Sequence, residues 1–223
     1  MDRSFTLEEL VGPLSATEAK GAPSQIWLRG DPSVITKGLC VAIVGSREAS
    51  PAGLKRAEVA AQIAVQLGYS VISGLAVGID KAAHRAAMIA KGRTAAVLGT
   101  PLSDVYPKEH AELHRYIGQK HLLISQFAEG TKTDSAHFPA RNRLMALLSH
   151  CSIVVEAQDA SGTLSHAKEA LRLKRPLFIM ASNFEDKSLK WPMEFEKKGA
   201  FRVSTAAELR ARLALIAKDL ESV

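Results

Sequence analysis

Glycine and hydroxyl-bearing residues recur together at or just beyond the ends of apolar runs in this sequence. Three pairs are Gly45-Ser46, Ser73-Gly74 and Gly99-Thr100. A triplet, Ser161-Gly162-Thr163, follows the apolar run 151–157 by a few residues. Small residues allow backbone N–H groups and helix N-termini to approach an anion closely. As a set these loops predict a phosphate-binding crevice, although each loop alone is equally typical of the turns of any α/β protein.

The stretch HFPARNRLMALLS, residues 137–149, carries unusual charge. Pro139 marks a helix start, so Arg141 and Arg143 are expected in the first helical turn, where the helix dipole disfavours cations. A phosphate would compensate this charge, and guanidinium groups suit phosphate geometry. An internal carboxylate such as Glu156 would also compensate it, and a solvated, charged helix end is the remaining alternative.

Asp80 and His84 lie four residues apart in GIDKAAHRAAM, residues 78–88, which reads as a helix. We expect a hydrogen bond between them that fixes a loop, because no nucleophile or metal-ligand cluster accompanies them as an acid-base pair would require. The seven histidines show no metal-ligand spacing with Cys or Asp. Neither G-x-G-x-x-G nor G-x-x-x-x-G-K-[ST] is present, so we expect no metal, no cofactor and no nucleoside triphosphate hydrolysis.

The elements that would position these residues alternate between strand and helix. Short apolar runs lie at 41–45, 69–74, 94–99, 121–125, 151–157 and 175–181. Helical segments separate most of them; in one, Val59, Ile63 and Leu67 repeat on one face. Strands that are apolar on both faces predict an α/β protein with a Rossmann-like, doubly wound, mostly parallel sheet in a single domain. Its ligand site is expected at the carboxyl ends of the strands, where Arg47 directly follows the first run.

Composition places the chain among folded proteins of a reducing compartment. It has 223 residues, 47% of them hydrophobic, a formal net charge of +6 and only Cys40 and Cys151, each beside an apolar run. This cysteine usage favours buried, reduced thiols over disulfides. We expect a cytoplasmic protein without a signal peptide or membrane span. The positive charge is compatible with a polyanionic partner but does not require one.

Three segments are predicted along the chain. Residues 1–38 form a lead-in that packs on the core, with a short helix at TLEEL and an edge strand at QIWLRGD. Residues 39–207 form the Rossmann-like domain, with GAFRV as its last strand. Residues 208–223 form a C-terminal helix whose preceding segment offers Thr205 as the N-cap.

Six motifs, taken in order, resemble the DprA/Smf DNA-processing family. They are VAIVGSR, VISGLAVGIDKAAH, AAVLGTPLSDVYP, LLISQF, HFPARNRLMALLS and IVVEAQDASGTLSHAKEAL, and the resemblance covers roughly residues 24–207, the Rossmann-like core only. It implies a non-catalytic, usually homodimeric protein that binds single-stranded DNA and passes it to a RecA-type recombinase. Its role would lie in natural transformation, DNA uptake or recombination, without a membrane.

The resemblance also implies which residues bind DNA or phosphate. They are Gly45, Ser46, Arg47, Ser73, Gly74, Gly78, Asp80, His84, Gly99, Phe138, Arg141, Asn142, Arg143, Glu156, Ser161, Gly162 and Thr163. The chain departs from the family pattern at Val77, where arginine is usual, and at Pro101, Gln126 and Ala181-Ser182. Loss of a cation at position 77 would weaken DNA binding.

Two other functions remain open. Nucleotide-processing enzymes of the same superfamily, the "lonely guy" phosphoribohydrolases, use Pro-Gly-Gly-x-Gly-Thr-x-x-Glu. This chain has QDASGTLSH with His166 at the position of the catalytic Glu, so we expect that chemistry to be absent. A sensor of a small nucleotide, as in a mobile element or a defence system, would use the same crevice for one ligand. Few aromatic residues, among them Tyr106, Phe127 and Phe138, are candidates for stacking on bases.

Overall fold

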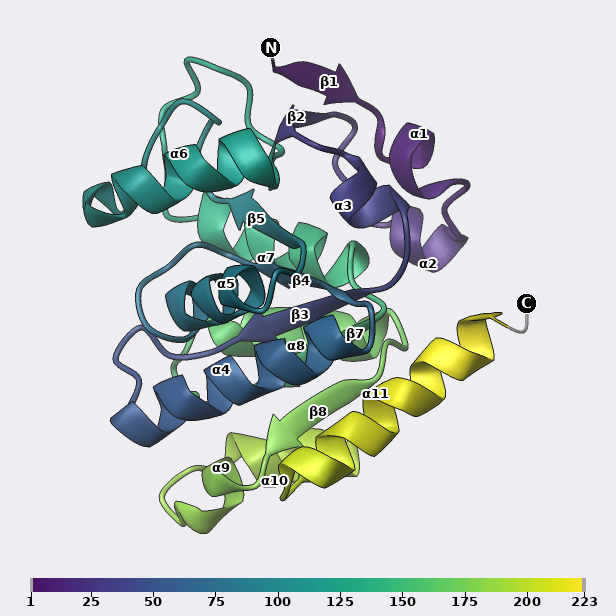
Figure 1. The fold of residues 1–223 in the computed structure, drawn as a ribbon, viewed down its shortest axis with the longest axis vertical. Coiled ribbons are helices and arrows are strands. Elements are labelled where there is room, and N and C mark those ends of the chain that lie inside the picture. Colours follow the sequence, from purple (N-terminus) through teal and green to yellow (C-terminus); the bar gives the residue numbers. More distant parts are fainter. Residues whose placement is uncertain (1, 222–223) are drawn as a thin grey trace.

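The computed structural model describes residues 2–221, with side chains described up to residue 219, and shows one nine-stranded sheet between two layers of helices (Figure 1). The strands lie in the order β1-β2-β6-β5-β4-β3-β7-β8-β9. Their bounds are β1 Arg3–Phe5, β2 Ile26–Gly30, β3 Cys40–Val44, β4 Ser70–Ser73, β5 Thr94–Leu98, β6 Leu122–Ser125, β7 Cys151–Val154, β8 Leu177–Met180 and β9 Phe201–Val203. The strands from β3 to β9 pair in parallel, which confirms the predicted Rossmann-like α/β fold.

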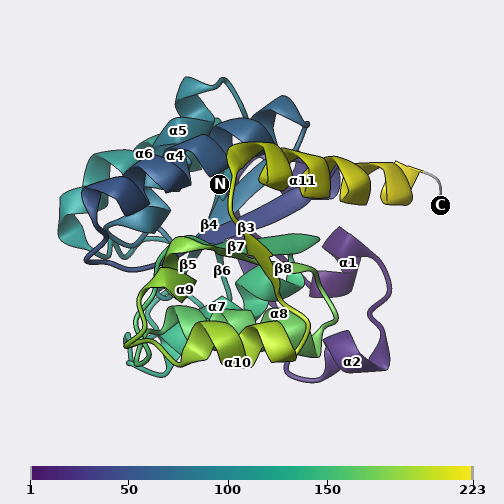
Figure 2. The same ribbon diagram turned by 90° about the horizontal axis from the view of Figure 1, so that it is seen from below.

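The helices are divided between the two faces of the sheet (Figure 2). One face carries α4 (Pro51–Gln66), α5 (Ile79–Ile89), α6 (Ala111–Lys120) with the short η1 (Lys108–His110) before it, and α11 (Ala206–Glu221). The other carries α1 (Leu7–Val11), α2 (Ala16–Ala19), α3 (Ser33–Thr36), α7 (His137–Leu147), α8 (Thr163–Arg172), α9 (Ser182–Glu185) and α10 (Trp191–Lys197). The core strands are therefore covered on both faces, as their unbroken apolar sequences require.

The chain reverses its direction of travel across the sheet at β3. The strands β4, β5 and β6 follow on one side of β3, whereas β7, β8 and β9 lie on the other side. The connections that leave β3 and β7 enter α4 and α8 on opposite faces of the sheet, so a crevice opens between them at the strands' carboxyl ends. This topological switch point is where ligands bind in open α/β sheets.

The N-terminal segment contributes to the sheet itself. β2 pairs antiparallel with β6, and β1 pairs antiparallel with the other side of β2. The predicted edge position of QIWLRGD is therefore wrong, because β1 covers that edge. The predicted short helix is α1, which begins with a capping box between Thr6 and Glu9. Leu7, Ile26 and Leu28 are buried, so this segment completes the hydrophobic core.

Two smaller expectations are confirmed, one about the cysteines and one about the cap of the last helix. Cys40 and Cys151 are buried free thiols. Thr205 accepts a hydrogen bond from the backbone N–H of Glu208 and so caps α11. Of the helices within residues 2–221, not one has the length and apolar character that crossing a bilayer demands.

Candidate functional site

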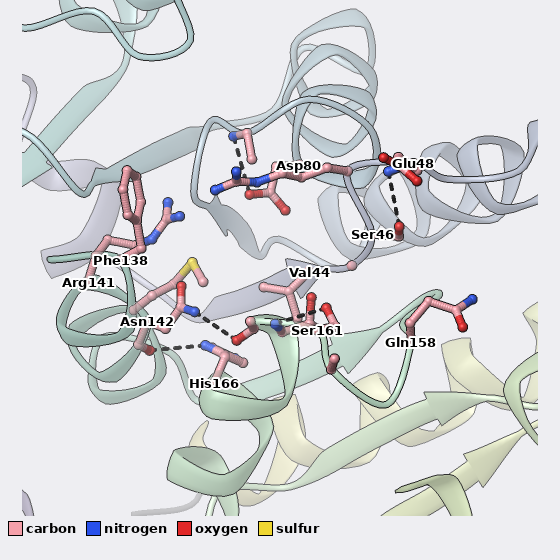
Figure 3. Close-up of a pocket in the computed structure, with 17 residues that line it drawn as sticks. Val44, Ser46, Glu48, Asp80, Phe138, Arg141, Asn142, Gln158, Ser161 and His166 are labelled. Carbon is pink, nitrogen blue, oxygen red and sulfur yellow. Dashed lines mark hydrogen bonds between the residues drawn. The ribbon is translucent and has the colours of Figure 1, made fainter. Parts of the chain in front are cut away.

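A pocket of about 560 Å³ opens at the topological switch point, and we call it the crevice (Figure 3). Four parts of the chain form it: the exit of β3, the start of α5, the inner face of α7 and the loop that enters α8. Its lining residues are Val44, Gly45, Ser46, Arg47, Glu48, Ala76, Asp80, Phe138, Arg141, Asn142, Met145, Gln158, Ala160, Ser161, Gly162, Thr163 and His166. The crevice thus lies at the carboxyl ends of the strands, where the sequence predicts a ligand site.

Arg47 stands exposed at the mouth of the crevice. Its guanidinium carbon lies 5.6 Å from the centre of the Phe138 ring, within the range of a cation–π contact. Within the part of the chain that the structure describes, Arg47 makes no salt bridge of 4.0 Å or less. Glu48, the next residue, is also exposed and lines the same mouth. The charge of Arg47 is therefore available to an incoming anion, with Glu48 opposing it.

Arg141 lies inside the crevice wall rather than on the surface. Its side chain is only 5% exposed, and its Nη1 donates hydrogen bonds to the carbonyl oxygens of Gly74 and, at 2.9 Å, Val97. Its buried Nε–H has no hydrogen-bond partner among the described residues. Burial lowers the pKa of Arg141 and the nearby Asp80 opposes that shift, but an arginine keeps its charge at neutral pH.

The sequence-based explanation of this arginine needs two corrections. Helix α7 begins at His137, two residues before Pro139, so Arg141 and Arg143 lie in its second turn and not in its first. Glu156 does not compensate Arg141, because its carboxylate accepts hydrogen bonds from Ser50 at the start of α4 and from Arg56. The carboxylate near Arg141 belongs to Asp80. Of the two arginines on α7, Arg143 is the exposed one, and it does not line the crevice.

Asp80 holds the loop between β4 and α5. One carboxylate oxygen accepts hydrogen bonds from the backbone N–H groups of Gly74, at 3.2 Å, and Ala76, at 3.4 Å. Burial raises the pKa of Asp80, while Arg141 and these hydrogen bonds act in the opposite direction. The expected bond to His84 is absent among the described contacts, since the Nδ1 of His84 instead contacts the Thr94 hydroxyl at 2.7 Å.

Asn142 fixes the start of α8 beside the crevice. Its Nδ2 donates to the carbonyl oxygen of Gly162 and to the hydroxyl of Ser165, both at 3.0 Å. His166 completes this contact between α7 and α8: its Nε2 lies 2.9 Å from the Ser152 hydroxyl and its Nδ1 lies 3.2 Å from the Asn142 carbonyl oxygen. Burial lowers the pKa of His166 to about 4, so the imidazole is neutral at pH 7.

Two glycines are required by close packing around these groups. Gly78 has φ +76°, and a side chain there would collide with the backbone carbonyls of Ser46 and Arg47. At Gly74 a side chain would occupy the position of the Arg141 guanidinium. Each glycine allows the loops of the crevice to approach one another.

A smaller hollow of about 120 Å³, which we call the slot, adjoins the crevice. The slot and the crevice share Arg47, Ala76, Phe138 and Arg141 as walls. The remaining walls of the slot are Gly74, Val77, Leu98, Gly99, Thr100, Tyr106 and Pro107. The rings of Tyr106 and Phe138 have centroids 5.3 Å apart. A side chain at Gly99 would collide with the Phe138 ring, so this glycine allows the ring to close one side of the slot.

The structure brings most of the predicted site residues together. The crevice contains Gly45, Ser46, Arg47, Asp80, Phe138, Arg141, Asn142, Ser161, Gly162 and Thr163, and the slot adds Gly74 and Gly99. Five predicted residues line neither hollow: Ser73, Gly78, His84, Arg143 and Glu156. Ser73 and His84 are fully buried, so their side chains have no access to a ligand in this structure.

Sequence reasoning missed several lining residues, notably Glu48, Met145 and His166 as part of the crevice wall. For His166 a signal was present, because it follows Thr163 by three residues and therefore lies on the same face of α8. Glu48 carries no such signal, since nothing in a loop sequence shows where a side chain points. Within residues 2–219, no group of three or more His, Cys, Asp or Glu side chains suited to a metal ion is found.

Comparison of the sequence with known proteins identifies one family. The family described as DNA recombination-mediator protein A matches residues 5–214. The chain is 32% identical over 187 residues to DNA processing protein DprA of Bacillus subtilis and 38% identical over 183 residues to that of Streptococcus pneumoniae. These matches cover 84% and 82% of this chain but only 63% and 64% of the relatives, so the chain spans less than two thirds of their length.

Solved structures agree with these sequence matches. The crystal structure of the Streptococcus pneumoniae protein superposes with a TM-score of 0.80 at 34% identity, covering 94% of this chain and 73% of that one. DNA processing protein A from Helicobacter pylori, described for its single-stranded DNA binding mode, superposes with a TM-score of 0.81 at 25% identity and covers 97% of both chains. The chain thus has the fold of these proteins over nearly its whole length.

Proposed function

The chain belongs to the DNA recombination-mediator protein A family, and from this premise we propose that it binds single-stranded DNA in the crevice. The observation that carries the proposal is that two arginines, Arg47 and Arg141, line the same crevice. Arg47 is exposed and without a carboxylate partner among the described residues, and the buried Arg141 has an unused Nε–H. A polyanion at the mouth would pair with the open guanidinium of Arg47, and the buried charge of Arg141 would add to the attraction at close range.

Each part of the crevice has a role in this proposal. Arg47 would pair with a phosphate at the mouth, where both partners remain partly hydrated. Gly45 and Ser46 are small enough to let the backbone approach the strand, and Asn142 would keep the first turn of α8 directed at it. The Phe138 ring beside Arg47 offers a surface for stacking a base. Phosphate contacts dominate this arrangement, so binding is expected to depend weakly on sequence and strongly on salt.

Binding without catalysis is part of the same proposal. His166 occupies the position where the related phosphoribohydrolases carry a catalytic Glu. It is fully buried, both ring nitrogens have partners, and its pKa of about 4 makes it a poor general base at neutral pH. This crevice therefore favours holding a strand over cleaving a nucleotide.

Family membership suggests the remaining parts of the proposal. We propose that the protein acts in the cytoplasm as a homodimer and passes its strand to a RecA-type recombinase during DNA uptake or recombination. Light scattering coupled to size-exclusion chromatography tests the dimer. Displacement of a single-strand-binding protein by recombinase, measured with and without this protein, tests the transfer.

Fluorescence anisotropy tests DNA binding directly. Labelled single-stranded oligothymidine is titrated at two salt concentrations, with duplex DNA and mononucleotides as competitors. We expect the single strand to bind, mononucleotides to compete poorly, and log affinity to fall with log salt concentration at about 0.7 per phosphate contacted. Arg47→Gln should reduce the affinity severalfold and lower this slope by about 0.7, because one phosphate contact is lost.

Glu48→Gln is the matched control, since it removes a charge of opposite sign from the neighbouring position at the same mouth. It should leave the affinity unchanged or raise it. Equal affinities of wild type and Arg47→Gln would remove Arg47 from the interface. Tight binding of a mononucleotide, with no binding of the strand, would replace this proposal by the small-nucleotide sensor.

A further inference from the structure

Glu156, two residues beyond the end of β7, lines neither hollow but contacts both ends of the loop that carries Arg47. We call residues 46–50, which lie between β3 and α4, the Arg47 loop. At its start, the backbone N–H of Ser46 donates a hydrogen bond of 2.7 Å to the carbonyl oxygen of Glu156. At its end, the Glu156 carboxylate accepts from the backbone N–H of Ser50 at 2.9 Å and from the Ser50 hydroxyl at 2.6 Å. A single residue therefore bridges the loop from one end to the other.

The Ser50 hydroxyl links this carboxylate to the start of α4. While it donates to Glu156, it accepts a hydrogen bond of 3.0 Å from the backbone N–H of Gly53 and so caps the helix. Gly53 also leaves the space that the carboxylate occupies, since a side chain there would collide with Glu156 Oε2. Arg56, further along α4, donates to the same oxygen at 3.3 Å. The end of the Arg47 loop and the first turn of α4 are thus fastened to Glu156.

The Arg47 side chain has no comparable anchor of its own. It makes no hydrogen bond and no salt bridge to the residues that the structure describes, and its guanidinium contacts the Phe138 ring at 5.6 Å. A cation–π contact at an exposed site is weak and holds a long side chain only loosely. The position of the guanidinium therefore depends on the backbone of the Arg47 loop, and that backbone is held by Glu156.

From these contacts we propose that Glu156 is a positioning residue for DNA binding: it clamps the Arg47 loop and so keeps the Arg47 guanidinium at the mouth of the crevice. The inference rests on the proposed function and adds to it a residue that lies outside both hollows. A loop that is free to move must be ordered when a ligand binds, and the lost entropy weakens binding. Holding the loop in place beforehand removes this cost.

The sign of the effect separates positioning from simple electrostatics. Glu156 carries a negative charge close to a proposed polyanion site, so on charge alone its removal should strengthen DNA binding. Positioning predicts the opposite for Glu156→Ala, which removes the carboxylate and both of its contacts with Ser50. Glu156→Gln is the matched variant, because it removes the same charge but keeps the hydrogen-bonding shape. Its amide oxygen can accept from the Ser50 N–H, and its amide N–H can donate to the Ser50 hydroxyl.

Fluorescence anisotropy with labelled oligothymidine compares wild type, Glu156→Ala, Glu156→Gln, Arg47→Gln and the double variant of Arg47→Gln with Glu156→Ala. We expect Glu156→Ala to bind severalfold more weakly than wild type and Glu156→Gln to restore the affinity. The double variant should bind no more weakly than Arg47→Gln alone, because the loop then has no guanidinium to position. Circular dichroism confirms that the variants are folded.

Hydrogen exchange measured by NMR observes the loop without DNA. The backbone N–H of Ser50 should exchange faster in Glu156→Ala than in wild type, because it has lost its acceptor. In Glu156→Gln the exchange should be slow again.

The outcomes separate this inference from the proposed function. Strand binding by Glu156→Ala at wild-type affinity or better overturns the inference alone. Equal weakening by Glu156→Ala and Glu156→Gln, additive losses in the double variant, or unchanged exchange at Ser50 in Glu156→Ala also overturn it and leave the proposed function standing. If wild type binds no strand, the proposed function and this inference fail together.

Discussion

The charged residues Asp80 and Arg141 are buried together beneath the crevice, and their environment explains why the fold tolerates them. Asp80 is 6% exposed and Arg141 5%. Backbone groups satisfy part of their hydrogen-bonding capacity: two N–H groups bind one carboxylate oxygen of Asp80, and two carbonyl oxygens accept from the Nη1 of Arg141. The attraction between the opposite charges of Asp80 and Arg141 also offsets part of the desolvation cost of burying them.

Asp80→Asn tests this compensation. The substitution keeps the shape of the side chain but leaves Arg141 as a buried charge without its carboxylate neighbour, which should lower the free energy of unfolding by about 3 kcal/mol. Urea denaturation of wild type and variant gives this value. Glu48→Gln removes an exposed carboxylate from the same crevice and should change stability by less than about 0.5 kcal/mol. Similar effects of both substitutions would show that Arg141 does not depend on Asp80.

Helix α8 is held against α7 and β7 by a histidine that must stay neutral. Its start is fixed by Asn142, and one turn further His166 contacts Ser152 and the Asn142 carbonyl. Protonation of His166 would place a charge at a fully buried site, where the cost of desolvation outweighs the attraction of Glu169. The contacts that hold the start of α8 therefore favour the neutral form of His166.

We predict that the protein loses stability in acid because His166 must stay neutral when it is buried. The pKa of His166 is about 4 in the folded protein against the ordinary 6.5, so the unfolded chain binds more protons between these values. Stability is therefore fully present above pH 6.5 and decreases as the pH falls towards 4, by about 3 kcal/mol from His166. Unfolding free energies measured by urea denaturation across this range should follow that trend.

His166→Gln should flatten the dependence, because it removes the titrating group. Part of the slope should remain, since burial also lowers the pKa of His84, to about 3. An identical pH dependence of the unfolding free energy in wild type and His166→Gln would show that His166 does not cause the loss of stability in acid.

At the scale of the whole molecule, the N-terminal segment and the Rossmann-like core share one hydrophobic interior. Leu7, Ile26 and Leu28 belong to the same buried cluster as residues of β3, β5, α7 and α8. The carbonyl oxygen of His121, just before β6, accepts a hydrogen bond from Asp31, which ties the end of β2 to the parallel part of the sheet. Such sharing predicts a single cooperative unfolding transition.

Leu28→Ala tests whether the segment unfolds with the core. Truncating this fully buried side chain should lower the global free energy of unfolding by about 2–5 kcal/mol, because it leaves a cavity in the common interior. Leu215→Ala, at a residue 61% exposed on α11, should have an effect below about 0.5 kcal/mol. A global transition unchanged by Leu28→Ala, or a separate early transition, would mark the segment as an independent appendage.

The sequence alone determined the strand order along the chain, the parallel sheet and the location of the candidate site at the strand ends. These features follow from local signals: apolar runs of strand length, glycines at the exits and caps such as Thr205. The spacing of large apolar residues was a poorer guide to which face of a helix is buried. In α4 the face that is buried most completely is the stripe Ala57, Ala60, Ala61 and Ala64, and of the three larger residues expected there only Ile63 is buried.

Only the tertiary structure decided which polar residues face the crevice and which support it. Arg141 is held by the carbonyl oxygens of Gly74 and Val97, residues 67 and 44 positions away, and the slot exists because loops after β4 and β5 meet Phe138 of α7. The physical reason is that the burial of a charge and the size of a hollow are properties of several distant segments at once, whereas sequence patterns report on one segment at a time.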